Sequence, residues 1–174
     1  MNTIRSRSSG LIRFVEAYRD YTTIPPPKIK KIQVAELLDH VANLEKVEIR
    51  KAKVKFAIST EPTDIELFGD EELLEMVLIN LIKNSIESVA QTANPAVTIE
   101  TRKDEEGVVS IQVIDNGPGI IPDALERIFV PFYTTKKAGS GIGLALSRQI
   151  MQLHNGTLTV ESIPNQETVF KMTF

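Results

Sequence analysis

Hydrophobic residues recur along this chain at two spacings, one typical of amphipathic helices and one typical of strands. The clearest helical pattern follows Gly69 and Asp70, where apolar residues return every three or four positions to about Ala90. Asp70 suits the N-cap, and Glu71 and Glu72 suit the positive end of the helix dipole. The predicted buried face consists of Leu73, Leu74, Val77, Leu78, Leu81, Ile82 and Ile86.

Hydrophobic periodicity predicts further helices and strands before and after this long helix in the sequence. The other predicted helices cover residues 8–21, 34–44, 123–128 (capped by Asp123) and about 143–154. Strands are predicted over residues 29–34, 54–59, 65–68, 96–102, 108–114, 157–161 and 167–174. The helix over 34–44 is expected to bury Leu37, Leu38, Val41 and Leu44. Residues 129–137 fit no regular element and are expected to form a hinged flap.

The first predicted helix stands apart from the rest of the chain. Leu11, Phe14, Val15 and Tyr18 form its apolar stripe, and the prolines at 25–27 must end it. This stripe either packs back on the domain or pairs with a partner. We favour the second interpretation, because so short a helix is only marginally stable by itself.

Composition restricts the functions that this chain can have. Its 174 residues suit one domain, and 42% hydrophobic and 25% charged residues are typical of a soluble fold. A net charge of −3 gives no basic field for nucleic acid. With no Cys and only two His, thiolate or His-rich metal sites are not expected. No apolar run suggests a membrane span or a signal peptide, so we expect a soluble, cytoplasmic protein.

An acidic residue followed by a glycine turn is the first candidate for chemistry. Asp115 ends the apolar run at 108–114 and opens the stretch DNGPGI. Its carboxylate can accept a hydrogen bond from an exocyclic amine such as that of adenine, and the glycines allow close approach of the backbone. Taken alone, the stretch is equally consistent with an ordinary Asn-Gly turn.

Two asparagines on the long helix are the second candidate. Asn80 and Asn84 lie one helical turn apart, close to the buried face. Amide oxygens are neutral, hard ligands that suit Mg²⁺ shared with a phosphate. The alternative is that both residues mark the polar margin of the helix. Lys83, between them, either approaches phosphate or is solvated.

A third candidate is the glycine-rich stretch at 139–144, which precedes a helix. Glycines at a helix start expose N–H groups to an anion, and the dipole adds to the attraction. The spacing matches neither the dinucleotide fingerprint nor a P-loop. The two histidines have ordinary interpretations: His40 as a solvated surface residue, and His154 as a partner of the helix dipole.

Four motifs, in this order, resemble the sequence boxes of the sensor histidine kinase catalytic domain: LINLIKNSIESV, DNGPGI, IFVPFYTT and GSGIGLALS. This domain belongs to the GHKL group of ATPases and kinases. The resemblance covers about residues 30–174 and implies a Bergerat-type α/β two-layer sandwich. In such a fold a mixed sheet of about five strands carries helices on one face and holds ATP under a mobile lid. Residues 1–29 would then be a remnant of the second helix of a dimerisation hairpin, with its proline linker.

The resemblance also implies roles for individual residues. Asp115 corresponds to the adenine reader and Asn84, supported by Asn80, to the Mg²⁺ ligand. Thr168 matches a threonine that shares the adenine water, although Asn165, Gln166 and Glu167 stand where relatives often have glycine, which leaves the role of Thr168 open. Phe129 matches the hinge of the lid, and Glu87 replaces a phosphate-binding lysine of some relatives. The remaining implied ATP contacts are Lys83, Gly117, Gly119, Ile120, Phe132, Thr135, Lys136, Ser140, Gly141, Gly143 and Leu144.

No phosphoacceptor histidine is expected in this chain, because neither His40 nor His154 is followed by an acid. The implied activity is transfer of the ATP γ-phosphoryl group to a His on a hairpin outside the chain, so the chain alone should not autophosphorylate. Implied partners are that hairpin domain, a response regulator, and a second copy through residues 8–21. The parent protein could be membrane-anchored. The alternatives are a GHKL ATPase or anti-sigma-type serine kinase, which generally carry Glu at the position of Asn80, and a nucleotide-free interaction module.

Overall fold

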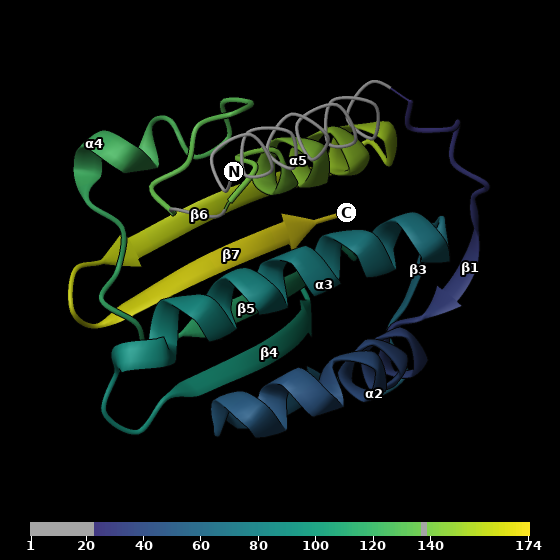
Figure 1. Ribbon diagram of the computed structural model, residues 1–174. Helices are drawn as coiled ribbons and strands as arrows, with labels where there is room; N and C mark the ends of the chain where they lie inside the picture. The colour runs from purple at the N-terminus through teal and green to yellow at the C-terminus, as the bar shows by residue number, and fades with distance from the viewer. Residues whose placement is uncertain (1–22, 137–138) are drawn as a thin grey trace, which may run out of the picture.

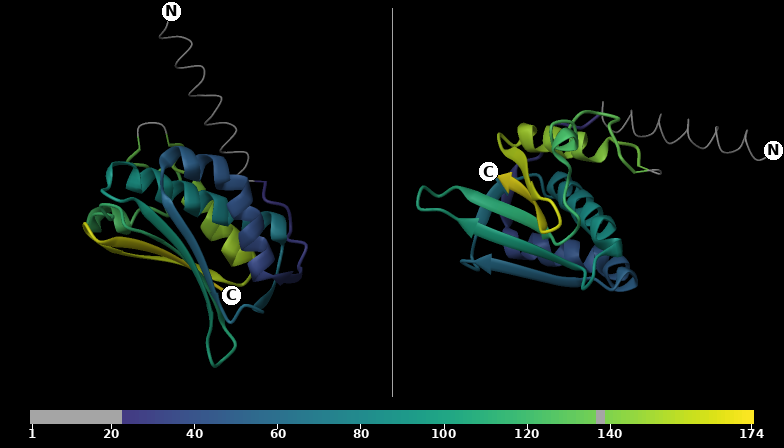
Figure 2. Two further views of the ribbon diagram at one scale, coloured as in Figure 1. Left: turned by 90° about the horizontal axis from the view of Figure 1, so that it is seen from below. Right: turned by 90° about the vertical axis from the view of Figure 1, so that its left-hand side faces the viewer.

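The computed structural model describes residues 23–136 and 139–174, which form two layers (Figure 1). Three long helices cover one face of a sheet, and the two further views show the other face uncovered (Figure 2). The predicted two-layer α/β sandwich is therefore confirmed. The predicted helix over residues 8–21 lies outside the described residues.

The main sheet has five strands in the order β2-β4-β5-β7-β6. They are β2 Lys55–Glu61, β4 Ala96–Lys103, β5 Val109–Asp115, β7 Glu167–Thr173 and β6 Thr157–Ile163. β2 and β4 are parallel, whereas the other neighbours are antiparallel, so the sheet is mixed as expected. β1 (Lys30–Gln33) and β3 (Glu66–Gly69) form a separate two-stranded sheet.

The helical layer consists of α2 (Val34–Ala52), α3 (Glu71–Ser88) and α5 (Gly143–Leu153). α3 runs into the short 3₁₀ helix η1 (Val89–Gln91), and α4 (Pro122–Leu125) lies in the connection between β5 and α5. All seven apolar residues predicted for the face of α3 are buried. They pack against alternate residues of the central strands, such as Val97, Ile111 and Met172. This core fixes α3 above the end of β5.

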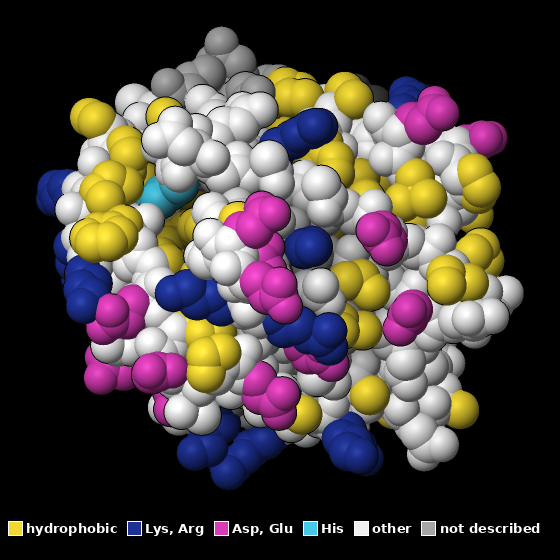
Figure 3. Space-filling view, turned by 180° about the vertical axis from the view of Figure 1, so that it is seen from behind, with side chains coloured by type: hydrophobic (Ala, Val, Ile, Leu, Met, Phe, Trp, Pro, Cys, Tyr) yellow, Lys and Arg dark blue, Asp and Glu magenta, His cyan; other side chains and the backbone are white. Residues whose placement is uncertain are grey.

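The outward residues of the strands form the uncovered face of the sheet (Figure 3). On that face Lys, Arg, Asp and Glu side chains alternate with small apolar areas (Figure 3). Among the described residues, no helix has the length and hydrophobicity that a membrane span needs.

The burial of α2 differs from the prediction. Leu44 was expected to be buried but is 51% exposed, whereas Glu45 is only 5% exposed. At about 100° per residue, Glu45 lies closer than Leu44 to the centre of the stripe that begins at Val34. The helix also continues beyond residue 44, and it ends where Lys53 adopts the left-handed conformation (φ 55°).

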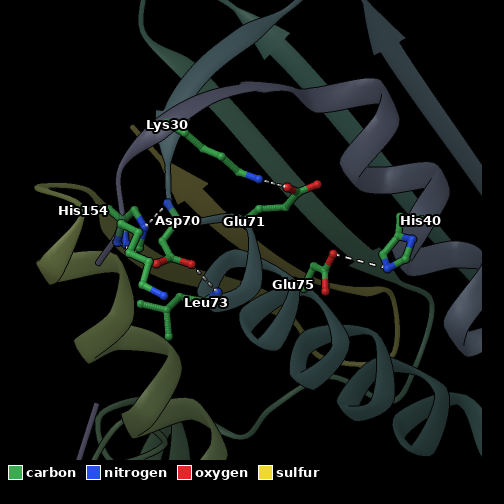
Figure 4. A network of polar contacts seen from close by, with 8 residues as sticks. Lys30, His40, Asp70, Glu71, Leu73, Glu75 and His154 are labelled. Atoms are coloured by element: carbon green, nitrogen blue, oxygen red, sulfur yellow. Dashed lines mark hydrogen bonds and ion pairs between the residues drawn. The ribbon is translucent and has the colours of Figure 1, made fainter. Parts of the chain in front are cut away.

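The beginning of α3 is fixed by contacts with distant parts of the chain (Figure 4). Asp70 caps the helix, because its Oδ1 accepts the N–H of Leu73 (3.2 Å) and its Oδ2 the N–H of Lys28 (2.7 Å). These backbone hydrogen bonds hold the pKa of Asp70 below its usual value, although burial of the carboxyl acts in the opposite direction. Thus the segment that follows the proline linker is tied to the helix that carries Asn80 and Asn84.

One expectation about the ends of helices is wrong, and another is extended by the structure. Asp123 was expected to cap α4, but Ile121 occupies the N-cap and Asp123 lies inside the first turn, after Pro122. His154 was expected to act as a partner of the dipole of α5, and its Nδ1 lies 2.7 Å from the carbonyl of Ile150 in the last turn of that helix. In addition, its Nε2 accepts the N–H of Asp70 (2.9 Å) (Figure 4). The ring of His154 therefore joins α5 to the beginning of α3.

Candidate functional site: a cavity between α3, β5 and the lid

A cavity of about 820 Å³ lies beside α3, at the end of β5 and under the segment that connects α4 to α5. Its volume is in the range of small-molecule and cofactor sites. It brings together thirteen of the fifteen residues predicted to contact the cofactor. These are Asn80, Lys83, Asn84, Asp115, Gly119, Ile120, Thr135, Lys136, Ser140, Gly141, Gly143, Leu144 and Thr168. Gly117 and Phe132 do not line it.

Asp115 lines the cavity and is only 2% exposed. Its Oδ1 accepts the backbone N–H of Gly117 (3.0 Å). Gly117 does not line the cavity, but its N–H orients the Asp115 carboxylate. Thr168 lies directly opposite Asp115 in the pairing of β5 with β7, although the sequence left its position in doubt. Gly119 adopts φ +79°, which an L side chain rarely adopts.

Burial raises the pKa of Asp115 above its ordinary value of 3.8. Smaller effects lower this pKa; they come from the N–H of Gly117, the hydroxyls of Ser85 and Ser88 and the charge of Lys136. A raised pKa in the folded state means that this carboxyl stabilises the fold below its unfolded pKa. That contribution is lost as the pH rises through the folded pKa.

We therefore expect Asp115→Asn to make the chain more stable to urea than the wild type at pH 7. The advantage should shrink as the pH falls through the raised pKa of Asp115, because the wild-type carboxyl then becomes neutral as well. Urea unfolding at a series of pH values measures this difference. An advantage that stays constant over that series would show that the ionisation of Asp115 does not oppose folding.

Asn80 and Asn84 have different positions in the cavity wall. Asn80 donates its amide N–H to Ser147 Oγ on α5 (2.9 Å), while its Oδ1 lies beside the amide nitrogen of Asn84 (3.5 Å). The amide of Asn84 is thereby oriented with its own Oδ1 outward, where the ammonium of Lys136 lies 2.7 Å away. The chain thus presents the Asn84 oxygen to a cation, as a Mg²⁺ ligand requires. Asn80 has its oxygen on the inner side and supports Asn84.

The cavity wall also contains lysine side chains and the glycine-rich start of α5. α5 begins at Gly143, so the unpaired N–H groups of its first turn lie at the wall. Lys83 also lines the wall, and its ammonium lies 3.4 Å from the buried Glu45 of α2. An anion bound here would meet the dipole of α5 and the side chains of Lys83 and Lys136.

Several residues of the wall were not predicted from the sequence. Ser88 follows Asn80 and Asn84 at the same four-residue spacing, so helical periodicity could have found it. Tyr133, whose ring lies 4.5 Å below the guanidinium of Arg127, and Thr134 come from the flap, where no periodic pattern exists. Ala124, Ile128 and Phe170 add apolar surface suited to a planar base.

The family profile described as "Histidine kinase-, DNA gyrase B-, and HSP90-like ATPase" matches residues 69–174. The chain therefore belongs to this ATPase family. This match contains all four motifs and the whole cavity wall described above.

Individual relatives are kinases. Sensor histidine kinase ZraS of Salmonella typhi is 31% identical over 142 residues, which are 82% of this chain and 30% of ZraS. Sporulation kinase A of Bacillus subtilis is 37% identical over 148 residues, 84% of this chain and 23% of that kinase. The chain thus spans less than a third of the length of these relatives.

Solved structures show the same similarity. The nucleotide-free catalytic domain of histidine kinase ThkA is 32% identical, with a TM-score of 0.76, over 84% of this chain and 95% of that domain. ThkA in complex with the response regulator TrrA is 28% identical, with a TM-score of 0.80, over 99% of this chain and 49% of that chain. Full-length ShkA with AMPPNP is only 22% identical, with a TM-score of 0.82 over 99% of this chain and 37% of that chain, and so supports the fold alone.

Proposed function

We propose that this chain is the ATP-binding catalytic domain of a two-component sensor kinase. In this proposal it transfers the γ-phosphoryl group of ATP to a histidine on a dimerisation hairpin outside the chain. The observation that carries the proposal is that the Asp115 carboxylate and the outward Oδ1 of Asn84 line one cavity that also contains the start of α5. These groups match the amine, the cation and the phosphates of one ATP molecule.

Each part of the cavity would hold a different part of the nucleotide. Asp115 would accept from the exocyclic amine of adenine, with Gly117, Gly119, Ile120 and Thr168 around the base. Asn84, supported by Asn80, would hold Mg²⁺, which neutralises phosphate charge when bound. The N–H groups at the start of α5 would bind phosphate oxygens. The remaining predicted contacts, with roles on the phosphate side or in the lid, are Lys83, Phe132, Thr135, Lys136, Ser140, Gly141, Gly143 and Leu144.

The positions of the two histidines support a phosphoacceptor histidine outside this chain. His40 is exposed on α2, with its Nε2 3.4 Å from Glu75, and both ring nitrogens of His154 are engaged (Figure 4). We propose that residues 1–29 are the end of the hairpin and its linker, through which two copies would pair, and that a response regulator receives the phosphoryl group next. The domain would act in the cytoplasm.

Hydrolysis of ATP by the isolated chain is the competing function. Hydrolysis needs a group that takes a proton from water. GHKL ATPases generally have Glu for this purpose at the position of Asn80. Asn80 is an amide, which cannot take a proton, and it is hydrogen-bonded to Ser147. We therefore expect nucleotide binding without steady turnover.

The proposal is tested by calorimetry with ATP and GTP, each with Mg²⁺ and with EDTA. Guanine has a carbonyl oxygen where adenine has its amine, and this oxygen would face the Asp115 carboxylate. ATP should bind, more tightly with Mg²⁺, and GTP should bind at least about 100-fold more weakly. Equal binding of the two nucleotides, or steady release of phosphate from ATP, would contradict the proposal.

Gly143→Ala should weaken ATP binding about tenfold or more and lower the free energy of unfolding by about 1–3 kcal/mol. A Cβ at this position would lie 2.3 Å from Asn80 Oδ1, so the asparagine that supports Asn84 would have to move. Calorimetry and urea unfolding measure the two effects.

Gly107→Ala is the control for this substitution. It also places alanine at a constrained glycine (φ +88°), in the turn between β4 and β5, where its Cβ meets only Lys103 at 3.9 Å. It should lower stability and leave ATP binding unchanged. If Gly143→Ala binds ATP like the wild type, close packing of α5 on Asn80 is not needed for the site.

A further inference from the structure

The ammonium of Lys136 lies between two oxygen atoms of α3. It donates to Oδ1 of Asn84 (2.7 Å) and to Oε2 of Glu87. Asn84 and Glu87 are three residues apart on the helix, so their side chains leave it on the same face. Lys136 belongs to the flap between α4 and α5, which is the lid of the cavity. Its contact therefore joins the lid to the helix that carries both asparagines.

The orientation of Asn84 makes this position suited to positive charge. Its amide nitrogen is directed toward Asn80, whose own amide nitrogen is bound to Ser147, and this arrangement directs the Asn84 oxygen toward Lys136. Glu87 adds a full negative charge. One neutral oxygen and one carboxylate oxygen converge on one point, which is an arrangement that binds a cation.

We infer that Lys136 is an internal counter-ion that fills the cation position of Asn84 in the nucleotide-free state, and that Glu87 is the latch that holds it there. This inference rests on the proposed function, in which Asn84 binds the Mg²⁺ of the nucleotide. Two cations do not share one oxygen at close distance, because their repulsion is strong. With Mg²⁺ and ATP bound, the ammonium of Lys136 would therefore leave Asn84.

The displacement has a consequence for the lid. Once released, Lys136 can turn toward the phosphates, since it lines the same cavity as Ser140 and Gly143. Metal and nucleotide together would thus unlock the lid from α3, whereas nucleotide without metal would leave the latch closed. Glu87 would then be a positioning residue that couples the state of the lid to the divalent cation.

The exposure of the ion pair between Lys136 and Glu87 limits the effect of the latch on ATP affinity. The side chains of Lys136 and Glu87 are 42% and 61% exposed, so their ion pair is a weak one. Glu87→Gln should therefore tighten binding of ATP with Mg²⁺ by only about two- to fivefold, since the metal no longer competes with a latched lysine. With EDTA in place of Mg²⁺ the gain should be absent.

A double-mutant cycle separates the latch from a simple loss of negative charge near phosphate. Calorimetry on the 174-residue chain compares Glu87→Gln, Lys136→Met and the double variant, with ATP and Mg²⁺. Glu87→Gln should tighten binding in the wild-type background and have no effect when residue 136 is Met. An equal gain in both backgrounds, or no gain in either, overturns the latch.

Glu48→Gln is the matched control. It removes one negative charge and one exposed ion pair, with Lys51 (2.8 Å), from α2. Its nucleotide affinity should equal that of the wild type. A gain equal to that of Glu87→Gln would show that the effect is not specific to the latch.

A second measurement needs no nucleotide and so separates failure of the latch from failure of the proposed function. Acetylation rates of individual lysines, followed by mass spectrometry, report whether an ammonium is engaged. Glu87→Gln should raise the rate at Lys136 about two- to fivefold and leave that of Lys51 unchanged. Equal responses of both lysines overturn the latch, whether or not ATP binds. If ATP fails to bind the wild type, the proposed function fails instead.

Discussion

Asp115→Asn is expected to weaken ATP binding at least about 100-fold while leaving the fold intact. The amide that replaces the carboxylate has one oxygen, and this oxygen is needed by the N–H of Gly117, which now bonds Oδ1 at 3.0 Å. The amide nitrogen would then face the cavity. A donor would meet the exocyclic amine of adenine, which also donates, and neither group could be satisfied.

Calorimetry with ATP and Mg²⁺ measures this loss, and Asp104→Asn provides its control. Asp104 also accepts backbone N–H groups, from Glu106 (3.1 Å) and Val108 (2.8 Å), but it lies in the turn between β4 and β5. The control should keep the affinity of the wild type. ATP binding that survives in Asp115→Asn, while the urea profile is unchanged or improved, would show that this carboxyl does not read the base.

Asn84→Ala should remove the effect of Mg²⁺ on nucleotide affinity. In the wild type we expect ATP to bind more tightly with Mg²⁺ than with EDTA, because the metal joins the phosphates to the Asn84 oxygen. Without this oxygen the two affinities should become nearly equal, which corresponds to a loss of roughly 10- to 100-fold when Mg²⁺ is present. The binding that remains should still depend on Asp115.

Asn43→Ala is the control for this variant, since Asn43 is an exposed asparagine in the middle of α2. Calorimetry with Mg²⁺ and with EDTA should give wild-type values for it. If Asn84→Ala keeps the full effect of Mg²⁺, the cation is held by other groups, and the outward orientation of the Asn84 amide has another purpose.

The sequence was sufficient for the fold because its strongest signals are periodic and local. The apolar positions of α3 and of the central strands determine which faces are buried, and the register of β5 with β7 places Thr168 opposite Asp115. Of the thirteen predicted contacts that line the cavity, eleven lie in the four motifs; the other two are Lys136 and Thr168. Neighbours along one helix, such as Asn80 and Asn84, could be paired from spacing alone.

Contacts between elements far apart in the sequence could not be predicted in this way. The pairing of Lys136 with Asn84 and Glu87 joins residues about fifty positions apart, and the flap has no periodicity to guide its side chains. The ion pair of the buried Glu45 with Lys83 likewise joins α2 to α3. The hydrogen bond from Asp70 to His154 also joins two helices that are far apart in the sequence.

The most direct test is a crystal structure of the chain with AMPPNP and Mn²⁺, whose anomalous signal locates the cation. We expect a manganese peak within coordination distance of Asn84 Oδ1, the adenine amine at the Asp115 carboxylate, and Lys136 withdrawn from Asn84. A manganese peak distant from Asn84, or an adenine ring bound elsewhere, would contradict this expectation.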